Sequence, residues 1–369
     1  MKVVVLQASG LHLGFLGCYG NDWIATPNLD RLASEGIVFD QHYVASLILP
    51  SPSGRGAGSE GKPSRPEKYD PHPNPLPGGE GAMTLPQVTH HRIANLETFA
   101  HDCAPSIQKL VETDGNLWID GPDLTPPWKL PADILSSYLD DEEEEVEPWP
   151  DPPIGETPDE FDVVRLQDTY AAAITWFDAQ LGVIFAEAKR LGIYDSVWWC
   201  VTASSGLPLG EHGRIGIDRP WLHEEAVHVP MIWRLPSAAE ACARVTALTQ
   251  TIDLLPSIAD RLGANIAPSP GKSLWPLVRG EADSIREFAV SAAKLSGGEE
   301  WMLRTPTAAL ILPISGPDDE PRKAQLYVKP DDRWEVNDVS SRQPEDTESL
   351  EKILRDCMNT QGAQAQGRP

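Results

Sequence analysis

Two short stretches in the second half of the chain contain side chains that could do acid–base or metal chemistry. The first is Leu209–Gly213, which reads Leu-Gly-Glu-His-Gly and sets the carboxylate of Glu211 beside the imidazole of His212. A histidine beside a carboxylate could transfer protons during hydrolysis. In a tight turn, however, a histidine more often packs or binds backbone than catalyses, so the same residues also fit a structural role.

The second stretch is His223-Glu224-Glu225, whose three side chains are of types that bind metal ions. Adjacent residues on an extended or helical segment point in different directions, so they do not readily converge on one ion. The stretch is therefore a weak indication of a metal site.

The five cysteines indicate neither a disulfide framework nor a zinc site, because they are odd in number and widely spaced. Cys103-Ala104-Pro105-Ser106 resembles part of a nucleophile motif and overlaps a helix that we predict over residues 106–113. We interpret Pro105-Ser106 as the start of that helix. Cys103 is then a small, half-buried residue and not a nucleophile.

The elements that would position these residues follow an α/β pattern. Lys2–Gln7 is rich in β-branched residues and predicts a short buried strand, and Val197–Thr202 predicts another. Between them, apolar residues recur at helical spacing from Phe161 to Ala188, and Gly192 is the expected stop. A helix followed directly by an apolar strand implies a largely parallel sheet.

Shorter elements are predicted before the long helix. Thr26 suits an N-cap and Pro27 the first turn of a helix that Gly36 ends. Residues 37–39 continue as an extended segment, and residues 116–119 predict a further strand. Sites in such sheets lie beyond the C-terminal ends of the strands. The ends to inspect are those after Leu6, Ile119 and Thr202.

Two stretches depart from this pattern. Residues 49–82 contain almost no aliphatic residues and show no period, so we expect a disordered insertion there. Residues 121–160 are rich in Pro, Asp and Glu, with an acidic run from Asp140 to Glu145. This composition is typical of a solvated loop.

The composition restricts the partners and the location that we expect. The 369 residues have a formal net charge of -25, so the surface repels phosphate backbones and anionic membranes, and we expect neither nucleic acid nor a membrane as partner. No stretch approaches the ~20 apolar residues of a membrane span. Because the apolar run near Met1 is too short for a signal peptide, we expect a cytoplasmic protein, with a missing leader as the alternative.

Several longer stretches agree with one family. The first reads LGCYGN at Leu16–Asn21 and then IATPNLDRLASEGIVFD at Ile24–Asp40. The others are Leu209–Gly213, Leu222–Pro236, Thr251–Gly263, Gly271–Gly280 and Leu326–Asp338. Together they resemble the sulfatase family, which implies an α/β fold of the alkaline-phosphatase-like type. A central, mostly parallel sheet would be flanked by helices over residues 1–280, and a small C-terminal α+β subdomain would occupy residues 281–369.

The resemblance also implies a mechanism. Sulfatases hold a divalent cation, usually calcium, with carboxylates, and attack the sulfate ester with a formylglycine made from a cysteine. Lysine and histidine side chains neutralise the sulfate and protonate the leaving group. In this chain the family's metal ligands fall on Ser9, Gly10, Ser204 and Ser205, and a family histidine falls near Thr125.

These positions predict a protein without the family's catalytic groups. Neutral hydroxyls cannot offset the dehydration of a divalent ion, so we expect no metal ligand and no cofactor. The family's lysine falls on Ile217, and no motif cysteine follows Ser46, so we assign no catalytic residue. We therefore expect a pseudoenzyme, whose partner would be a small anionic ligand or an active homologue.

Two alternatives remain open. One is an active hydrolase that uses a different constellation, with Ser9, Ser204 or Ser205 acting together with His212. The other is a decaying gene whose product has no selected role.

Overall fold

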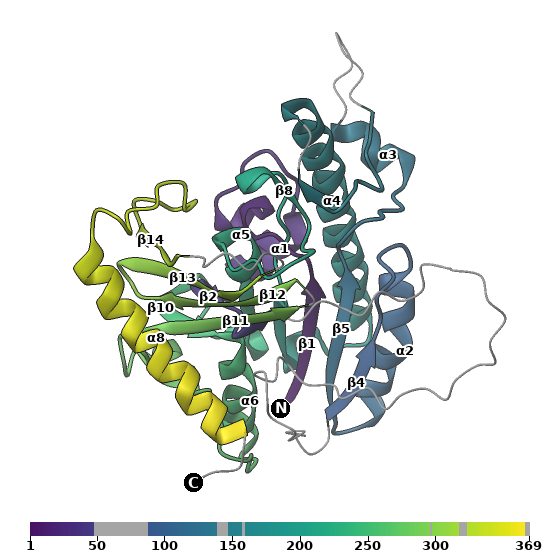
Figure 1. The fold of residues 1–369 in the computed structure, drawn as a ribbon. Coiled ribbons are helices and arrows are strands. Elements are labelled where there is room, and N and C mark those ends of the chain that lie inside the picture. The colour runs from purple at the N-terminus through teal and green to yellow at the C-terminus, as the bar shows by residue number, and fades with distance from the viewer. Residues whose placement is uncertain (48–87, 139–146, 157–158, 296, 317–322, 366–369) are drawn as a thin grey trace, which may run out of the picture.

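The protein is described here by a computed structural model, which covers residues 1–47, 88–138, 147–156, 159–295, 297–316 and 323–365. A seven-stranded main sheet has the strand order β10-β2-β9-β7-β1-β5-β4 (Figure 1). Its strands are β1 Lys2–Ser9, β2 Ile37–Tyr43, β4 Val88–Arg92, β5 Asn116–Asp123, β7 Val197–Ala203, β9 Met231–Arg234 and β10 Ala243–Gln250. Neighbouring strands are parallel except where β9 pairs with β2 and β7. The predicted mostly parallel sheet is confirmed.

Strand β1 lies between β5 and β7 and is buried on both faces. Val4 and Leu6 belong to one hydrophobic core, and Val3 and Val5 belong to another on the opposite face. Alternate side chains of a strand point to opposite faces, so its continuous apolar run supplies both cores. The C-terminal ends of these three parallel strands consequently meet at one edge of the sheet.

Helices cover both faces of the main sheet. The first core includes residues of α1 Pro27–Ser34, α2 Phe99–Glu112 and α4 Glu160–Arg190, and the second includes residues of α6 Leu254–Leu262 and α7 Trp275–Val278. The long helix α4 begins where the side chain of Asp159 accepts a hydrogen bond from the Asp162 amide. It ends just before Gly192, whose φ of 70° is left-handed, as predicted.

A five-stranded small sheet follows in the chain, with the order β14-β13-β12-β11-β3. Its strands are β3 Ser46–Leu47, β11 Ala289–Leu295, β12 Gly298–Arg304, β13 Ala308–Ser315 and β14 Gln325–Val328. Helix α8 Pro344–Ala365 runs across one face of this sheet and buries Leu354 there (Figure 1). Because β3 precedes all the other strands by more than two hundred residues, the small sheet also uses the N-terminal part of the chain. The division at residue 280 stays a prediction.

The short helix α2 corrects one prediction. It begins at Phe99, so Pro105 lies inside the helix, and Pro105-Ser106 is not its start. Phe99, Cys103 and Ile107 recur every four residues and form the buried face, which fixes the helix earlier than the proline suggests. Pro105 is exposed, so the hydrogen bond that it lacks lies on the solvent side. Cys103 is fully buried and not half-buried.

Two further expectations are corrected. Strand β5 runs to Asp123, so the loop predicted from residue 121 starts later. The loop contains α3 Ala132–Leu135, a 3-10 turn Ser136–Tyr138 and β6 Gly155–Glu156. Strand β6 pairs with β8 Arg214–Ile215. Thr26 does precede α1, but its side chain accepts from the Gly17 amide at 3.0 Å and does not cap the helix.

The predicted insertion at 49–82 and the acidic run Asp140–Glu145 lie outside the described residues. Among the residues that the structure describes, no helix has the length and apolar character needed to cross a membrane.

Candidate functional site

Five of the six predicted site residues meet at the C-terminal edge of the main sheet. Ser9 ends β1 and is in register with Asp123, which ends β5. The amide of Gly10 donates to Oγ of Ser205 at 3.1 Å, which links the residues after β1 to those after β7. A Cβ added at Gly10 would lie 3.0 Å from Cγ2 of Thr125, so the residues after β5 close the third side. We call this group, with Ser204, the strand-end site.

The backbone of Gly10 has a conformation that favours glycine. Its φ is 72°, in the left-handed region, and its carbonyl accepts a hydrogen bond from Tyr170 Oη at 2.6 Å. The same hydroxyl accepts from the amide of His12 at 2.9 Å. A carboxylate side chain at this position would meet both the backbone strain and Thr125.

The hydroxyls of the strand-end site bind mainly to neighbouring backbone. Ser204 Oγ lies 3.3 Å from the carbonyl of Ala8, and Ser205 Oγ accepts from Gly10. Ser9 Oγ is buried without a hydrogen-bond partner among the described residues. The hydrogen bonds of Ser204 and Ser205 therefore link β1 to β7. The hydroxyls do not form a ring of ligands.

Asp123 is a carboxylate at this edge that the sequence did not identify. Its Oδ1 accepts from the amide of Thr125 at 3.0 Å and from Thr125 Oγ1 at 2.8 Å. Its position shortly after Ile119 could have indicated it, because a site is expected beyond that strand end. Because the predicted strand was too short, Asp123 was assigned to the acidic loop.

The donors present do not fit a calcium ion. Calcium takes six to eight oxygen ligands, several of them anionic. The strand-end site offers one carboxylate, whose Oδ1 already binds Thr125, together with neutral serine hydroxyls. Within the described ranges, no group of three His, Cys, Asp or Glu side chains is arranged to hold a metal ion.

His12 and Glu211 form a pair that the sequence did not predict. Nδ1 of His12 accepts from the Gly14 amide at 2.9 Å, so Nε2 carries the proton and lies 3.2 Å from Oε1 of Glu211. Oε2 of Glu211 accepts from the Leu209 amide. Burial raises the pKa of Glu211, but its contact with His12 and its hydrogen bonds from backbone amides lower the pKa further than burial raises it. Glu211 is thus held as a carboxylate by local partners.

His212, the sixth predicted residue, belongs to a second cluster. Its ring centroid lies 4.2 Å from that of His223 and 5.8 Å from that of Trp221. Its Nε2 lies 3.9 Å from Oε2 of Glu225. Burial, and then the neighbouring His223, lower the pKa of His212, so the imidazole is neutral at neutral pH. The φ of His212 is 53°, which fits the tight turn expected for this loop.

Glu225 is the most perturbed carboxyl of this second cluster. The residue is 3% exposed, and its Oε1 accepts from Trp221 Nε1 at 2.7 Å. Oε2 is buried and has no hydrogen bond among the described residues. Burial raises the pKa of Glu225 to about 7, although His223 and the bond from Trp221 partly oppose it. A carboxyl with such a pKa could exchange protons near neutral pH.

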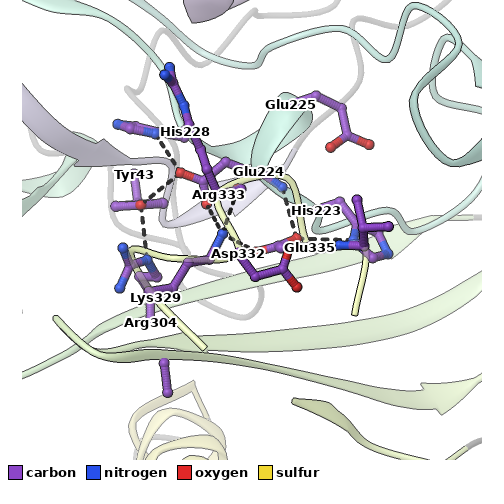
Figure 2. A network of polar contacts seen from close by, with 12 residues as sticks. Tyr43, His223, Glu224, Glu225, His228, Arg304, Lys329, Asp332, Arg333 and Glu335 are labelled. Atoms are coloured by element: carbon purple, nitrogen blue, oxygen red, sulfur yellow. Dashed lines mark hydrogen bonds and ion pairs between the residues drawn. The ribbon is translucent and has the colours of Figure 1, made fainter. Parts of the chain in front are cut away.

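A buried polar network lies beside this cluster (Figure 2). Glu224, on α5 Glu224–Val227, pairs through Oε2 with Lys329 Nζ at 3.0 Å. Glu335 pairs through Oε2 with His223 Nδ1 at 3.0 Å. His223, Glu224 and Glu225 therefore have separate partners, which agrees with the expectation that their side chains diverge. Sequence reasoning missed Lys329 and Glu335, which lie far along the chain.

The same network continues to the main sheet. Oε1 of Glu224 accepts from Tyr43 Oη at 3.0 Å and lies 2.6 Å from His228 Nδ1. Arg304 Nε donates to Tyr43 Oη at 3.0 Å. Burial raises the pKa of Glu224, but His228, Lys329 and Arg304 lower it well below its usual range.

Comparisons with known proteins agree with the sequence resemblance. A family model described as "Sulfatase" matches residues 122–264. An N-acetylglucosamine-6-O-sulfatase of Bacteroides thetaiotaomicron is 28% identical over 125 residues, which are 33% of this chain and 22% of that protein. Human arylsulfatase A is 39% identical over 90 residues, or 24% of this chain and 17% of that protein. The chain thus aligns with less than a quarter of the length of these curated relatives.

Solved structures match over nearly the whole chain. The phosphonate monoester hydrolase of Agrobacterium radiobacter has a TM-score of 0.69 at 16% identity, covering 97% of this chain and 95% of that one. A 2-O GAG sulfatase has a TM-score of 0.69 at 15% identity, covering 100% and 94%. At these identities the likeness shows the fold alone, and it confirms the alkaline-phosphatase-like α/β fold.

Proposed function

Because this chain belongs to the sulfatase family, we propose that it is a family member that does not hydrolyse sulfate esters. The observation that supports this most strongly is the strand-end site, where Ser9, Gly10, Ser204 and Ser205 stand at the family's ligand positions. The hydroxyls of Ser204 and Ser205 are engaged with neighbouring backbone. Although the family is typically calcium-dependent, these donors do not suit that ion.

Among the residues that the structure describes, we also identify no nucleophile. Cys103 lies in a partial motif, but it packs inside the core on α2. Burial, and then the charge of Asp102, raise its pKa to about 12, whereas a reactive thiol needs a lowered pKa. The family's motif is expected just after Ser46, in a stretch that begins where the described residues stop.

The charges near the site disfavour a sulfate group. The family's lysine position holds Ile217, a buried apolar residue. Glu211 is a carboxylate close to His12, and Asp123 lies at the strand-end site. Carboxylates in a partly buried site repel a bound oxyanion by Coulomb forces. Of the two partners considered from the sequence, an active homologue therefore fits better than a small anionic ligand.

Hydrolysis of an aryl sulfate tests the proposal. The protein is purified after coexpression with a formylglycine-generating enzyme, and a wild-type family member prepared in parallel is the positive control. We expect the release of product to match that of heat-denatured protein. Turnover above that level would overturn the proposal.

A second candidate function is an active hydrolase with a different acid–base pair. One observation favours it: the buried carboxyl of Glu225, with a pKa near neutrality, lies 3.9 Å from His212 Nε2. If this pair catalyses, any phosphoester or sulfate-ester turnover falls about 10²-fold or more in both His212→Ala and Glu225→Gln. If neither change lowers turnover, this pair is excluded as the acid–base pair.

A further inference from the structure

One segment joins the two sheets through buried charges. We call Lys329–Glu335, between β14 and α8, the clasp. At one end Lys329 lies 3.0 Å from Oε2 of Glu224, and at the other Glu335 lies 3.0 Å from Nδ1 of His223 (Figure 2). Lys329 Nζ also lies 3.1 Å from Oε1 of Glu335, so the two ends of the clasp bind each other. The small sheet is thereby tied to α5, above the main sheet.

Protonated His223 supplies one of the positive charges of this contact. Glu224 and Glu335 are carboxylates whose side chains are 8% and 0% exposed, and they share the single ammonium of Lys329. Glu224 has a further partner in His228. The ion pairs of Glu335 within the described residues are those with Lys329 and His223. Loss of an opposite charge destabilises a buried carboxylate, and Glu335 loses one of its two ion-pair partners when His223 becomes neutral.

The clasp also covers the turn that follows β1. Its residue Trp334 is packed so close to Gly14 that an added Cβ there would lie 3.5 Å from the indole ring. Gly14 lies in the 3-10 turn Leu13–Phe15, a few residues beyond the strand-end site. Movement of the clasp would therefore expose the Leu13–Phe15 turn.

We propose that the clasp is a proton-operated latch, in which protonated His223 holds it closed over the Leu13–Phe15 turn and loss of the proton releases it. This inference needs only the ion pairs between the clasp and the residues around α5. It is independent of whether the chain hydrolyses sulfate esters.

The groups that face His223 come from several elements. Burial alone lowers the pKa of His223, but Glu335 on the clasp, with Glu225 on α5 and Glu300 on β12, raises it above its ordinary value. The other neighbours are the rings of His212, Trp221 and Tyr327. Since the closed state has the higher pKa, its advantage is complete below about pH 6.5 and is lost as the pH rises through the raised value.

Amide hydrogen exchange at about pH 6 and about pH 9, corrected for the intrinsic effect of pH, tests the latch. The amide of Glu224 is the reporter, because it donates across the contact to Oε2 of Glu335 at 3.1 Å. Because closure raises the pKa of His223, loss of its proton favours the open state. We expect the Glu224 amide to be better protected at the lower pH, while amides of β1 stay unchanged.

Variants identify the group that titrates. His223→Gln keeps a donor for Glu335 but cannot titrate. In this variant the Glu224 amide should therefore show the same weak protection at both pH values. In Glu225→Gln the pH dependence should remain, and so should it in His101→Gln, a control that removes an exposed histidine of α2. The wild type and Glu225→Gln test the latch even if His223→Gln does not fold.

Three results would overturn the latch. The first is equal protection of the Glu224 amide in the wild type at both pH values. The second is a pH dependence that persists in His223→Gln, and the third is one that disappears in Glu225→Gln.

Discussion

The amide of Gly10 donates to the hydroxyl of Ser205 at 3.1 Å, and this bond joins the ends of β1 and β7. Gly10 adopts φ 72° and lies against Thr125, so the local backbone is built around a residue without a side chain. A side chain at residue 10 would therefore meet both backbone strain and Thr125.

Gly10→Ala should destabilise the protein by more than Gly263→Ala. Both positions have left-handed φ values, of 72° and 64°, so each alanine loses about 1–2 kcal/mol from backbone strain. At Gly263 a Cβ meets open space, whereas at Gly10 it meets Thr125. We expect Gly10→Ala to cost about 1 kcal/mol more in denaturant unfolding.

A second variant tests whether that difference comes from Thr125. Thr125→Ser removes Cγ2 and keeps the hydroxyl that donates to Asp123. Combined with Gly10→Ala, it should recover most of the extra loss. No difference between the two alanine variants would mean that Thr125 does not restrict Gly10.

The melting temperature should be the same in chelator and in millimolar calcium. Neutral hydroxyls at Ser9, Ser204 and Ser205 do not hold a divalent ion. A ligand present at 100 times its Kd would add about 2.7 kcal/mol to the free energy of unfolding, which thermal unfolding would reveal easily. A calcium-dependent rise of that size would contradict the account of the strand-end site.

Glu225→Gln should stabilise the protein above neutral pH. The folded pKa of Glu225 is raised to about 7, so its contribution to stability is intact in acid and is lost as the pH rises towards and through 7. Glutamine cannot ionise, so the variant does not lose this stability as the pH rises. The gain at about pH 8 should be on the order of 1–3 kcal/mol and should vanish near pH 4.

Glu211→Gln is the matched control for that experiment, because its pKa shift has the opposite sign. The folded pKa of Glu211 is lowered, so its ionised form stabilises the fold above the ordinary carboxyl pKa. We expect this variant to destabilise the protein near pH 8. If both variants changed the free energy of unfolding in the same direction, the assigned environments would be wrong.

The main elements could be predicted from local sequence patterns. The apolar run of β1, the periodicity of α4 and the position of Gly192 all gave correct elements. The start of α2 was mispredicted because Pro105 suits a first turn, while the buried spacing from Phe99 outweighs that preference.

The candidate site could be predicted in part. Ser9, Gly10 and Ser205 were named from the resemblance to the sulfatase family, and the structure brings them together at the ends of β1 and β7. The pairing of Glu224 with Lys329 joins residues 105 positions apart, and no local pattern encodes such a contact. His12 was missed for the same reason, because its partner Glu211 lies in a distant turn.

The most direct measurement of the central claim is the rate of aryl sulfate hydrolysis by the purified full chain after coexpression with a formylglycine-generating enzyme. Removal of one charge-stabilising group typically lowers a rate by ~10²–10³, and we propose that the metal ligands, the nucleophile and the cationic clamp are replaced together here. The account predicts no product above the denatured control, with or without calcium. Sustained turnover that is lost in His212→Ala or Ser204→Ala would contradict it.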